Sequence, residues 1–573
     1  MHWSWWVLGL GLGGCAEPAE APTAELDGLP DVARVFGEVS RLRELPSTRV
    51  PRAKFLRFGE YRATLQRLND EPQEGVAAYA EKLGLSAAHA AVGDEQARLF
   101  SSNGLYAQSD STIYVLDDPS RRFPLLLEQV VAHESVHALQ HQHGLLPAPH
   151  EQFENDEALA RRALIEGDAT LGMLLYEERN WRTPVARLAE KVRRGFAEEP
   201  ISHYVGATSP ELQGSPPYQQ EMVLFPYRAG AAFVGALLAA GGYATVAAAF
   251  KAPPRSTAQI LHPERYARGE QPVAVPLPTP PAGYSLAKSS VLGELLTRSL
   301  LLRCNSESQA IEAAEGWRGD TVAFLAQGAN ELVAQQWLMD SERDARELET
   351  ALRVSCNGFS ALSVFQRGSR VVGVRGGSAQ LAAQLAAAWL SAPVADAAPR
   401  KPLGATDLLP LPPRRALRDR YVEANRLRIP AAGVELPVPK GFQLHQGSGE
   451  LERRDRHASI AVLPLLGQYF EDAPRQILRE VSRSMQAAIA FSNIVERGEP
   501  YPVSLRLGNA RALDFEHEGT IARGRVIAIP RCGGAGLLAV VQYYGEGQEN
   551  AENAAISSLS AFDDDPYCRA LTH

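Results

Sequence analysis

The stretch LLLEQVVAHESVHALQHQH, residues 125–143, decides how the first part of this chain folds. Its apolar residues recur every three to four positions, and Leu126 and Val130 form a stripe that continues into two histidines. Gly144 is the first following position that favours the end of a helix. We therefore predict one helix from about Phe123 to Gln142.

Three polar residues on this helix have the spacing of a metal site. His133, Glu134 and His137 form the pattern H-E-x-x-H, in which positions i and i+4 share one helical face about 6 Å apart. Two imidazoles can therefore bind one ion, and the glutamate lies where it can take a proton from a bound water. The pattern predicts a Zn²⁺ site with Glu134 as general base, and this site needs a third protein ligand.

Two further histidines in the stretch compete for the place of third ligand. His141 lies eight residues after His133, about 12 Å along a helix, which is too far for one ion to be shared. His143 gives the metzincin spacing, but that pattern has a glycine where this chain has Gln140, because the backbone must leave the helix there. A metzincin also needs a methionine turn, which the sequence around Met222 matches poorly.

The other candidate is Glu166, on a helix predicted from about Asn155 to Glu178. Its neighbours in ALARRALIEGDATLGMLL are apolar, a setting where an unpaired carboxylate is costly and metal ligation relieves the cost. A glutamate from the following antiparallel helix is the gluzincin arrangement, and Gly167 would let the two helices approach closely. The alternative is a salt bridge from Glu166 to Arg161 or Arg162.

Residues outside the motif are expected to orient the metal ligands and to bind the substrate. Metal-bound histidines donate their other N–H to a carboxylate or carbonyl, and Asp168 is the candidate acceptor, with a surface aspartate as the alternative. An oxyanion donor opposite the base is expected from Tyr227, Arg228 or His262. A strand predicted at residues 112–116 lies just before the helix, where an edge strand can pair with an extended substrate.

Longer segments resemble a family of uncharacterised bacterial exported zincin-like proteins. The segments AHESVHALQHQH, RRALIEGDAT, FPYRAGAAFV, PPRSTAQILHPERY, LGELL and GWRGD carry the resemblance, which covers roughly residues 50–390. It implies a zincin-like fold with Glu134 as base and with three zinc ligands, His133, His137 and Glu166. The chain departs from the family at His141, where the family has aspartate, and the resemblance names no substrate.

The N-terminus, MHWSWWVLGLGLGGC, is typical of an exported lipoprotein, although its only basic residue is His2. The apolar run is too short to span a bilayer and ends in a sequence that resembles a lipobox, with Cys15 as the lipidated residue. Residues 1–14 would be the signal peptide and 15–27 a tether, and Ala16 favours the outer membrane of a bacterial envelope. The alternative is an apolar start without a targeting role.

Composition excludes some partners. A net charge of -9 and a pI of about 5.9 give no electrostatic reason to expect binding to nucleic acid or to an anionic membrane, so we expect a membrane contact through lipid alone. The expected substrate, a peptide or protein, follows from the zinc-hydrolase motif. The remaining cysteines predict two disulfides in an exported chain, with free thiols as the alternative. The expected pairs are Cys304–Cys356 and Cys532–Cys568.

The expected fold class is α+β. Residues 28–390 predict a mainly helical zincin-like domain with a small edge sheet, although residues 361–377 read as a β-hairpin. Residues 391–415 form a Pro/Ala linker, and residues 416–573 predict an antiparallel sheet with two helices. The element order of this last region resembles Mog1/PsbP-like domains.

These features lead to one main functional hypothesis and two alternatives. The main hypothesis is a lipid-anchored zinc metallopeptidase of the gluzincin type. The first alternative is a non-catalytic envelope protein that uses zinc to stabilise a binding or structural module, although such a protein would have no use for Glu134. The second is a zinc amidase that acts on cell-wall peptides.

Overall fold

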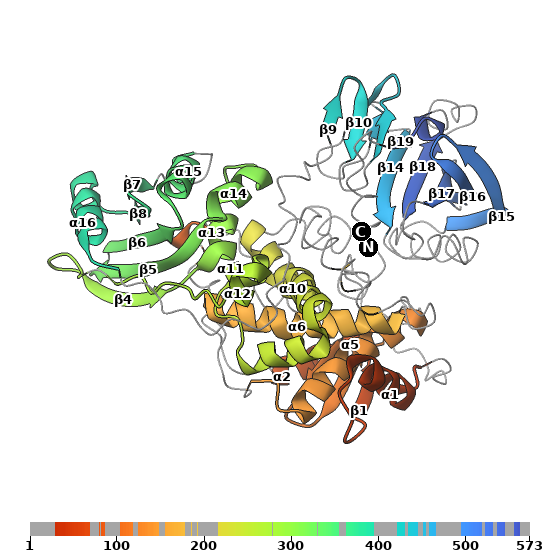
Figure 1. Cartoon of the computed structure of the whole chain (residues 1–573), viewed down its shortest axis with the longest axis horizontal. Helices are drawn as coiled ribbons and strands as arrows, with labels where there is room; N and C mark the ends of the chain where they lie inside the picture. Colours follow the sequence, from red (N-terminus) through yellow and green to blue (C-terminus); the bar gives the residue numbers. More distant parts are fainter. Residues whose placement is uncertain are drawn as a thin grey trace.

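The computed structural model shows a chain of mixed helices and largely antiparallel sheets, in agreement with the α+β prediction (Figure 1). The predicted signal peptide, the tether and most of the predicted linker lie outside the described residues. The structure describes residues 29–68, 80, 82–85, 104–117, 124–147, 155–177, 185, 189, 192, 216–277, 279–328, 330–354, 362–394, 421–429, 434–444, 451–453, 458–465, 494–517, 522–530, 536–544 and 555–561.

Five helices within the described residues carry the predicted site or pack around it. Apolar spacing predicts two short N-terminal helices at residues 32–45 and 61–70, and these, the histidine-bearing helix and the helix that follows it are confirmed to within three residues. Gly144 has φ +64° and ends the histidine-bearing helix, as its sequence position predicts. The helices are α1 (Val32–Arg43), α2 (Phe58–Leu68), α5 (Pro124–Gln142), α6 (Asp156–Glu177) and α10 (Pro217–Lys251).

Glycines let α6 approach both of its neighbours. A Cβ atom on Gly167 would lie 2.1 Å from the carbonyl carbon of Gly230, so the backbones of α6 and α10 are in direct contact. The expectation that Gly167 admits α5 is therefore wrong, because this glycine faces α10 instead. Gly172 has that role, since a Cβ there would lie 2.5 Å from Val136 on α5. The close packing holds α6 firmly between α5 and α10.

Helix α10 extends well beyond residues 225–242, where the apolar, Ala/Gly-rich sequence predicts a helix. Gly241 and Gly242 have non-helical backbone angles, with φ +66° at Gly242, so α10 consists of two helical segments joined at a kink. Among the described residues, Tyr218–Lys251 is the one helix long and apolar enough to cross a membrane, and 56% of the apolar window is buried inside the protein. Its contacts with α6 identify it as a core helix.

A three-stranded sheet lies against α5. Its strands are β1 (Arg52–Leu56), β2 (Gly104–Ala107) and β3 (Thr112–Leu116), in the order β1-β3-β2. The strand at 112–116 is confirmed, but it is the central strand, and β2 takes the edge position expected for it. A Cβ on Gly104 would lie 2.4 Å from Val130 of α5, so the edge strand touches the histidine-bearing helix.

The prediction of a mainly helical region up to residue 390 is wrong for its second half. Residues 285–375 contain a five-stranded antiparallel sheet, of which only the β7–β8 hairpin was predicted. The apolar run of β5 is buried on both faces, so it lacks the alternation that marks a half-buried strand. In the order β4-β5-β6-β8-β7, the strands are Ser285–Ser290, Trp317–Gln327, Asn330–Met339, Arg370–Arg375 and Ser363–Arg367.

Short helices flank this sheet (Figure 1). Helix α16 packs on one face, where its Trp389 is buried, while Trp317 and Trp337 belong to the core that the sheet shares with the helical body. Cys304 is disulfide-bonded, and the other predicted disulfide cysteines lie outside the described residues, so their pairing stays a prediction. The flanking helices are α13 (Gly293–Leu301), α14 (Glu307–Ala314), α15 (Glu342–Leu352) and α16 (Ala379–Ser391), while α11 (Thr257–Leu261) and α12 (Pro263–Ala267) pack against α10.

The C-terminal region contains two antiparallel sheets with a core of their own. The strands predicted at 433–444, 457–466, 510–518, 524–532 and 537–545 are confirmed. Of the two predicted helices, 473–489 lies outside the described residues, and 550–562 is wrong at its end, where residues 560–561 form a strand. The Mog1/PsbP-like resemblance stays a prediction. One sheet has the order β12-β13-β14-β18-β17-β16-β15, with strands Phe442–Leu444, Leu451–Arg453, Ala458–Leu465, Gly536–Tyr544, Ala522–Pro530, Gly508–His517 and Ile494–Leu505. The other has the order β19-β11-β10-β9, with strands Ser560–Ala561, Val434–Pro437, Arg426–Ile429 and Tyr421–Glu423.

Candidate metal centre

The structure brings the two motif histidines and Glu166 together. One ligand atom from each of the three residues lies within 4.8 Å of the other two. The Nε2 atoms of His133 and His137 are each 3.3 Å from the same carboxylate oxygen, Oε2 of Glu166. The three side chains are only 7%, 13% and 15% exposed. Three donors therefore point at one shared, largely buried position.

The helices explain this convergence. His133 and His137 are one helical turn apart on α5, and their ring centroids lie 4.9 Å apart. Glu166 lies near the middle of α6, the helix that packs against α5 on one side and α10 on the other. Two imidazoles and one carboxylate are the protein ligands that a catalytic zinc takes, so these described residues fit the ion.

The charges at the site are strongly coupled. Burial opposes a charge on His137, but the neighbouring Glu166 outweighs it and raises the pKa of this imidazole to about 9. Burial also opposes a charge on Glu166, yet the two imidazoles hold the pKa of its carboxyl well below the usual range. The carboxylate of Glu166 is thus kept ionised by the two imidazoles that face it.

Glu134 lies beside this position, against the edge strand. It is 6% exposed, and burial raises the pKa of its carboxyl, while its carboxylate accepts a hydrogen bond from the backbone N–H of Tyr106. A Cβ on Gly104 would come within 2.9 Å of Glu134 Oε1, so a glycine is needed where β2 passes the carboxylate. A raised pKa brings a carboxylate closer to the range of an effective general base near neutral pH.

Tyr227 also lies at the site. Its ring centroid is 5.8 Å from that of His133, and its hydroxyl is hydrogen-bonded to Arg162. Burial raises the pKa of this hydroxyl, so it stays protonated and able to donate at neutral pH. The guanidinium of Arg162 reaches only to 4.0 Å from Glu166, and Arg161 pairs with Glu157 instead. The salt-bridge alternative for Glu166 therefore rests on one distant, partly exposed arginine.

Gln140 is a functional residue that reasoning from sequence missed. His137 Nδ1 lies 2.9 Å from Gln140 Oε1, and Gln140 Nε2 lies 2.9 Å from Asp168 Oδ2. Asp168 therefore reaches His137 through the amide and not directly. The signal was present in the sequence, because Gln140 follows His137 by three residues on the same helix, but the glutamine was considered only as an obstacle to the metzincin turn.

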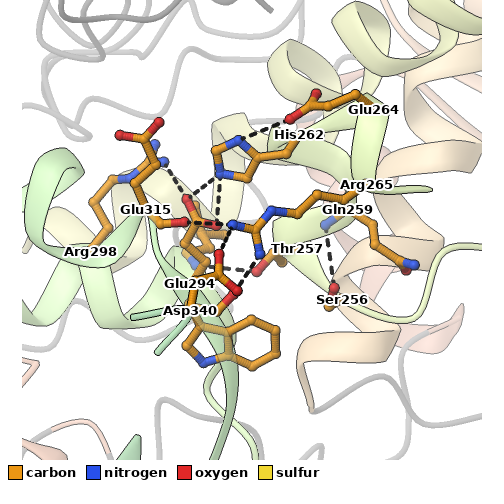
Figure 2. Close-up of polar contacts among 12 residues, drawn as sticks. Ser256, Thr257, Gln259, His262, Glu264, Arg265, Glu294, Arg298, Glu315 and Asp340 are labelled. Carbon is orange, nitrogen blue, oxygen red and sulfur yellow. Dashed lines mark hydrogen bonds and ion pairs between the residues drawn. The ribbon is translucent and has the colours of Figure 1, made fainter. Parts of the chain in front are cut away.

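The remaining candidate residues bind elsewhere. His141 Nδ1 lies 2.8 Å from the hydroxyl of Tyr106, and His143 Nε2 lies 2.9 Å from the carbonyl oxygen of Pro46, so neither joins the three ligand atoms. The Nε2 atom of His262 lies 3.0 Å from both carboxylate oxygens of Glu294, in a separate polar cluster (Figure 2). Of the predicted oxyanion donors, Tyr227 thus lies beside the metal ligands and His262 does not, while Arg228 is buried.

Comparison with known proteins identifies one domain. Residues 283–388 match the model of a domain of unknown function, DUF8575. The match coincides with the five-stranded sheet and helices α13–α16, and it begins after the residues of the metal centre. No curated protein matches the chain.

Proposed function

We propose that this protein is a zinc-dependent peptidase of the gluzincin type, with Glu166 as third ligand and Glu134 as general base. One observation carries the proposal: the two Nε2 atoms and the Glu166 carboxylate meet at one buried position, and Glu134 lies next to it. A purely structural zinc is normally enclosed by four protein ligands and needs no base beside it. The three-ligand arrangement therefore favours catalysis.

The side chains divide the work of hydrolysis. A zinc ion at this position would polarise the scissile carbonyl and lower the pKa of the attacking water. Glu134 accepts the water's proton and passes it to the leaving amine. The protonated hydroxyl of Tyr227 donates a hydrogen bond to the negative charge that develops on the carbonyl oxygen.

The neighbouring edge strand supplies a place for the substrate backbone. Within the described residues, β2 pairs with β3 on one side and with no strand on the other. An extended peptide that adds to such an edge gains backbone hydrogen bonds and alternate side-chain contacts. Because Gly104 of β2 lies against Glu134, a peptide on this edge would bring its scissile bond to the base. A lipid anchor at Cys15 would confine this activity to the bacterial envelope.

Cleavage of a peptide library, with and without a zinc chelator, tests the proposal. We expect cleavage that chelation abolishes and zinc restores, and Glu134→Gln should lower it by about 10³-fold while zinc stays bound. The matched control is Glu264→Gln, which removes a carboxylate from the separate His262 cluster. A zinc-bound wild type that cleaves no peptide would favour the non-catalytic alternative, and cleavage of cell-wall peptides alone would favour the amidase.

A further inference from the structure

A buried row of polar side chains runs from the metal centre to helix α1. His137 Nδ1 lies 2.9 Å from Gln140 Oε1, and Gln140 Nε2 donates to Asp168 Oδ2 over the same distance. Arg43 Nε then donates to Asp168 Oδ1 at 2.6 Å. Gln140, Asp168 and Arg43 are at most 2% exposed, so the row is closed to water.

The hydrogen bonds in this row have a direction. The Gln140 amide nitrogen faces two acceptors, the carbonyl oxygen of Ile165 at 3.1 Å and the carboxylate that Arg43 pairs with. The amide oxygen must therefore face His137, where it can only accept. His137 therefore has a proton on Nδ1, and its Nε2 faces Glu166, where a zinc ion would take the Nε2 lone pair.

We propose that Gln140 is a positioning residue that fixes the tautomer and ring orientation of His137 for metal binding, and that Asp168 and Arg43 hold the Gln140 amide in place. This inference rests on the proposed metal site. The Arg43 guanidinium is in turn stacked over the ring of Tyr243 at 4.3 Å, so α1, α5, α6 and α10 all contribute to the orientation of one ligand.

A second glutamine on the same helix supplies a matched control. The side chain of Gln142 binds the backbone of Thr48 and Arg49 and ties the end of α5 to the neighbouring loop. It stabilises the helix end without a bond to His137. A loss that arises only from Gln140→Leu, and not from Gln142→Leu, is therefore a loss of histidine positioning.

Zinc affinity, measured by competition with a chelator, gives the first readout. Gln140→Leu keeps a similar side-chain volume and should weaken zinc binding by about 10- to 100-fold, the usual cost of removing a partner behind a metal-bound histidine. Gln142→Leu should stay within about twofold of the wild type on the same reasoning. Equal affinity in the Gln140→Leu variant and the wild type would overturn the proposal.

Exchanging the amide of Gln140 with the carboxylate of Asp168 tests the direction of the hydrogen bonds in this row. Gln140→Glu alone sets two carboxylates against each other and should weaken zinc binding. Adding Asp168→Asn restores a donor between positions 140 and 168, while the Ile165 carbonyl still faces a carboxylate, so the double variant should bind zinc more tightly than Gln140→Glu alone. A double variant as weak as Gln140→Glu alone would overturn the proposal.

The histidine ring itself gives a readout that needs no turnover. In the zinc-loaded wild type, ¹⁵N spectra should show the proton of His137 on Nδ1, the atom that faces Gln140 Oε1. A proton on Nε2 would overturn the role of Gln140, whatever the activity. A protein that binds zinc and shows the Nδ1 proton but cleaves nothing would instead overturn only the proposed function.

Discussion

Two buried clusters in this protein use the same residue types in different ways. In one, Glu166 faces two imidazoles through a single carboxylate oxygen. In the other, Glu294 faces His262 through both oxygens and also accepts a hydrogen bond from Arg298 at 3.2 Å (Figure 2). Glu294 is fully buried, and Arg298 is 4% exposed.

The two clusters differ in the source of the positive charge that faces each glutamate carboxylate. Arg298 supplies the His262 cluster with a permanent positive charge, and Arg265 adds another, paired with Asp340 (Figure 2). That cluster is neutralised by its own residues and needs no ion. At Glu166 the nearest arginine is 4.0 Å away and partly exposed, so two imidazoles and one carboxylate remain to bind a cation. A histidine and a glutamate in contact therefore indicate a metal only where no guanidinium pairs with the carboxylate.

The strongest test of this comparison is to remove each glutamate in turn. Glu166→Ala should weaken zinc binding by more than about 100-fold, because it deletes one of three ligands. Glu294→Ala should leave zinc binding nearly unchanged and lower the free energy of unfolding by about 3–5 kcal/mol, because it leaves Arg298 and His262 buried without their anion. Chelator competition and urea unfolding of both variants measure the two effects. Loss of zinc from the Glu294 variant alone would reverse our assignment.

The next largest effect is expected from a substitution at the close contact between α6 and α10. Gly167→Ala places a methyl group against the backbone of Gly230 and should lower the free energy of unfolding by about 1–3 kcal/mol through overpacking. Because α6 carries Glu166, the shifted helix should also weaken zinc binding. Gly144→Ala serves as control, since its Cβ would meet nothing within 4 Å and its cost is confined to a positive φ. Wild-type zinc affinity in Gly167→Ala would show that the ligand tolerates movement of its helix.

The ion pair of the His262 cluster predicts a dependence of stability on pH. Burial opposes a charge on His262, but Glu294 outweighs it and raises the pKa of the imidazole. The contribution of the His262–Glu294 ion pair to the free energy of unfolding is fully present below the unfolded pKa of His262, about 6.5, and is lost as the pH rises through its folded pKa. The stability difference between wild type and His262→Gln should therefore be larger at pH 6 than at pH 9. An equal difference at both pH values, measured by urea unfolding, would contradict this assignment.

The smallest effect is expected for the histidine that the metzincin spacing would select. His143 binds the carbonyl oxygen of Pro46 at the end of α5, so His143→Ala should leave zinc affinity and peptide cleavage within about twofold of the wild type. The control is His137→Ala, which should abolish both. Loss of zinc from His143→Ala would favour the metzincin arrangement over Glu166.

Most of the site could be predicted, because its main signals are local. The spacing of His133 and His137 fixes their common face on any α-helix, and an apolar setting around Glu166 marks a carboxylate that needs a partner. Gln140 was missed although it follows His137 on the same helix, because its other partners, Ile165 and Asp168, come from α6, and helical spacing does not show which faces of two helices meet. The assignment of Gly167 to α5 failed for the same reason.

Secondary structure was predictable where a helix or strand is buried on one face only. Helices α1, α5 and α6 followed from apolar spacing and end signals, but β5 and β6 did not. Strand β5 is covered on both faces, and a continuous apolar run does not distinguish a buried strand from a buried helix. The order of β2 and β3 depends on pairing between segments and cannot be read from either strand alone.

Anomalous X-ray diffraction from zinc-loaded crystals tests the central claim most directly. We expect one zinc peak with His133 Nε2 and His137 Nε2 at about 2.0–2.1 Å and a Glu166 carboxylate oxygen at about 2.0–2.2 Å. Glu134 should lie beside the open position without binding the metal. A peak coordinated by His143, or no peak between α5 and α6, would contradict the account.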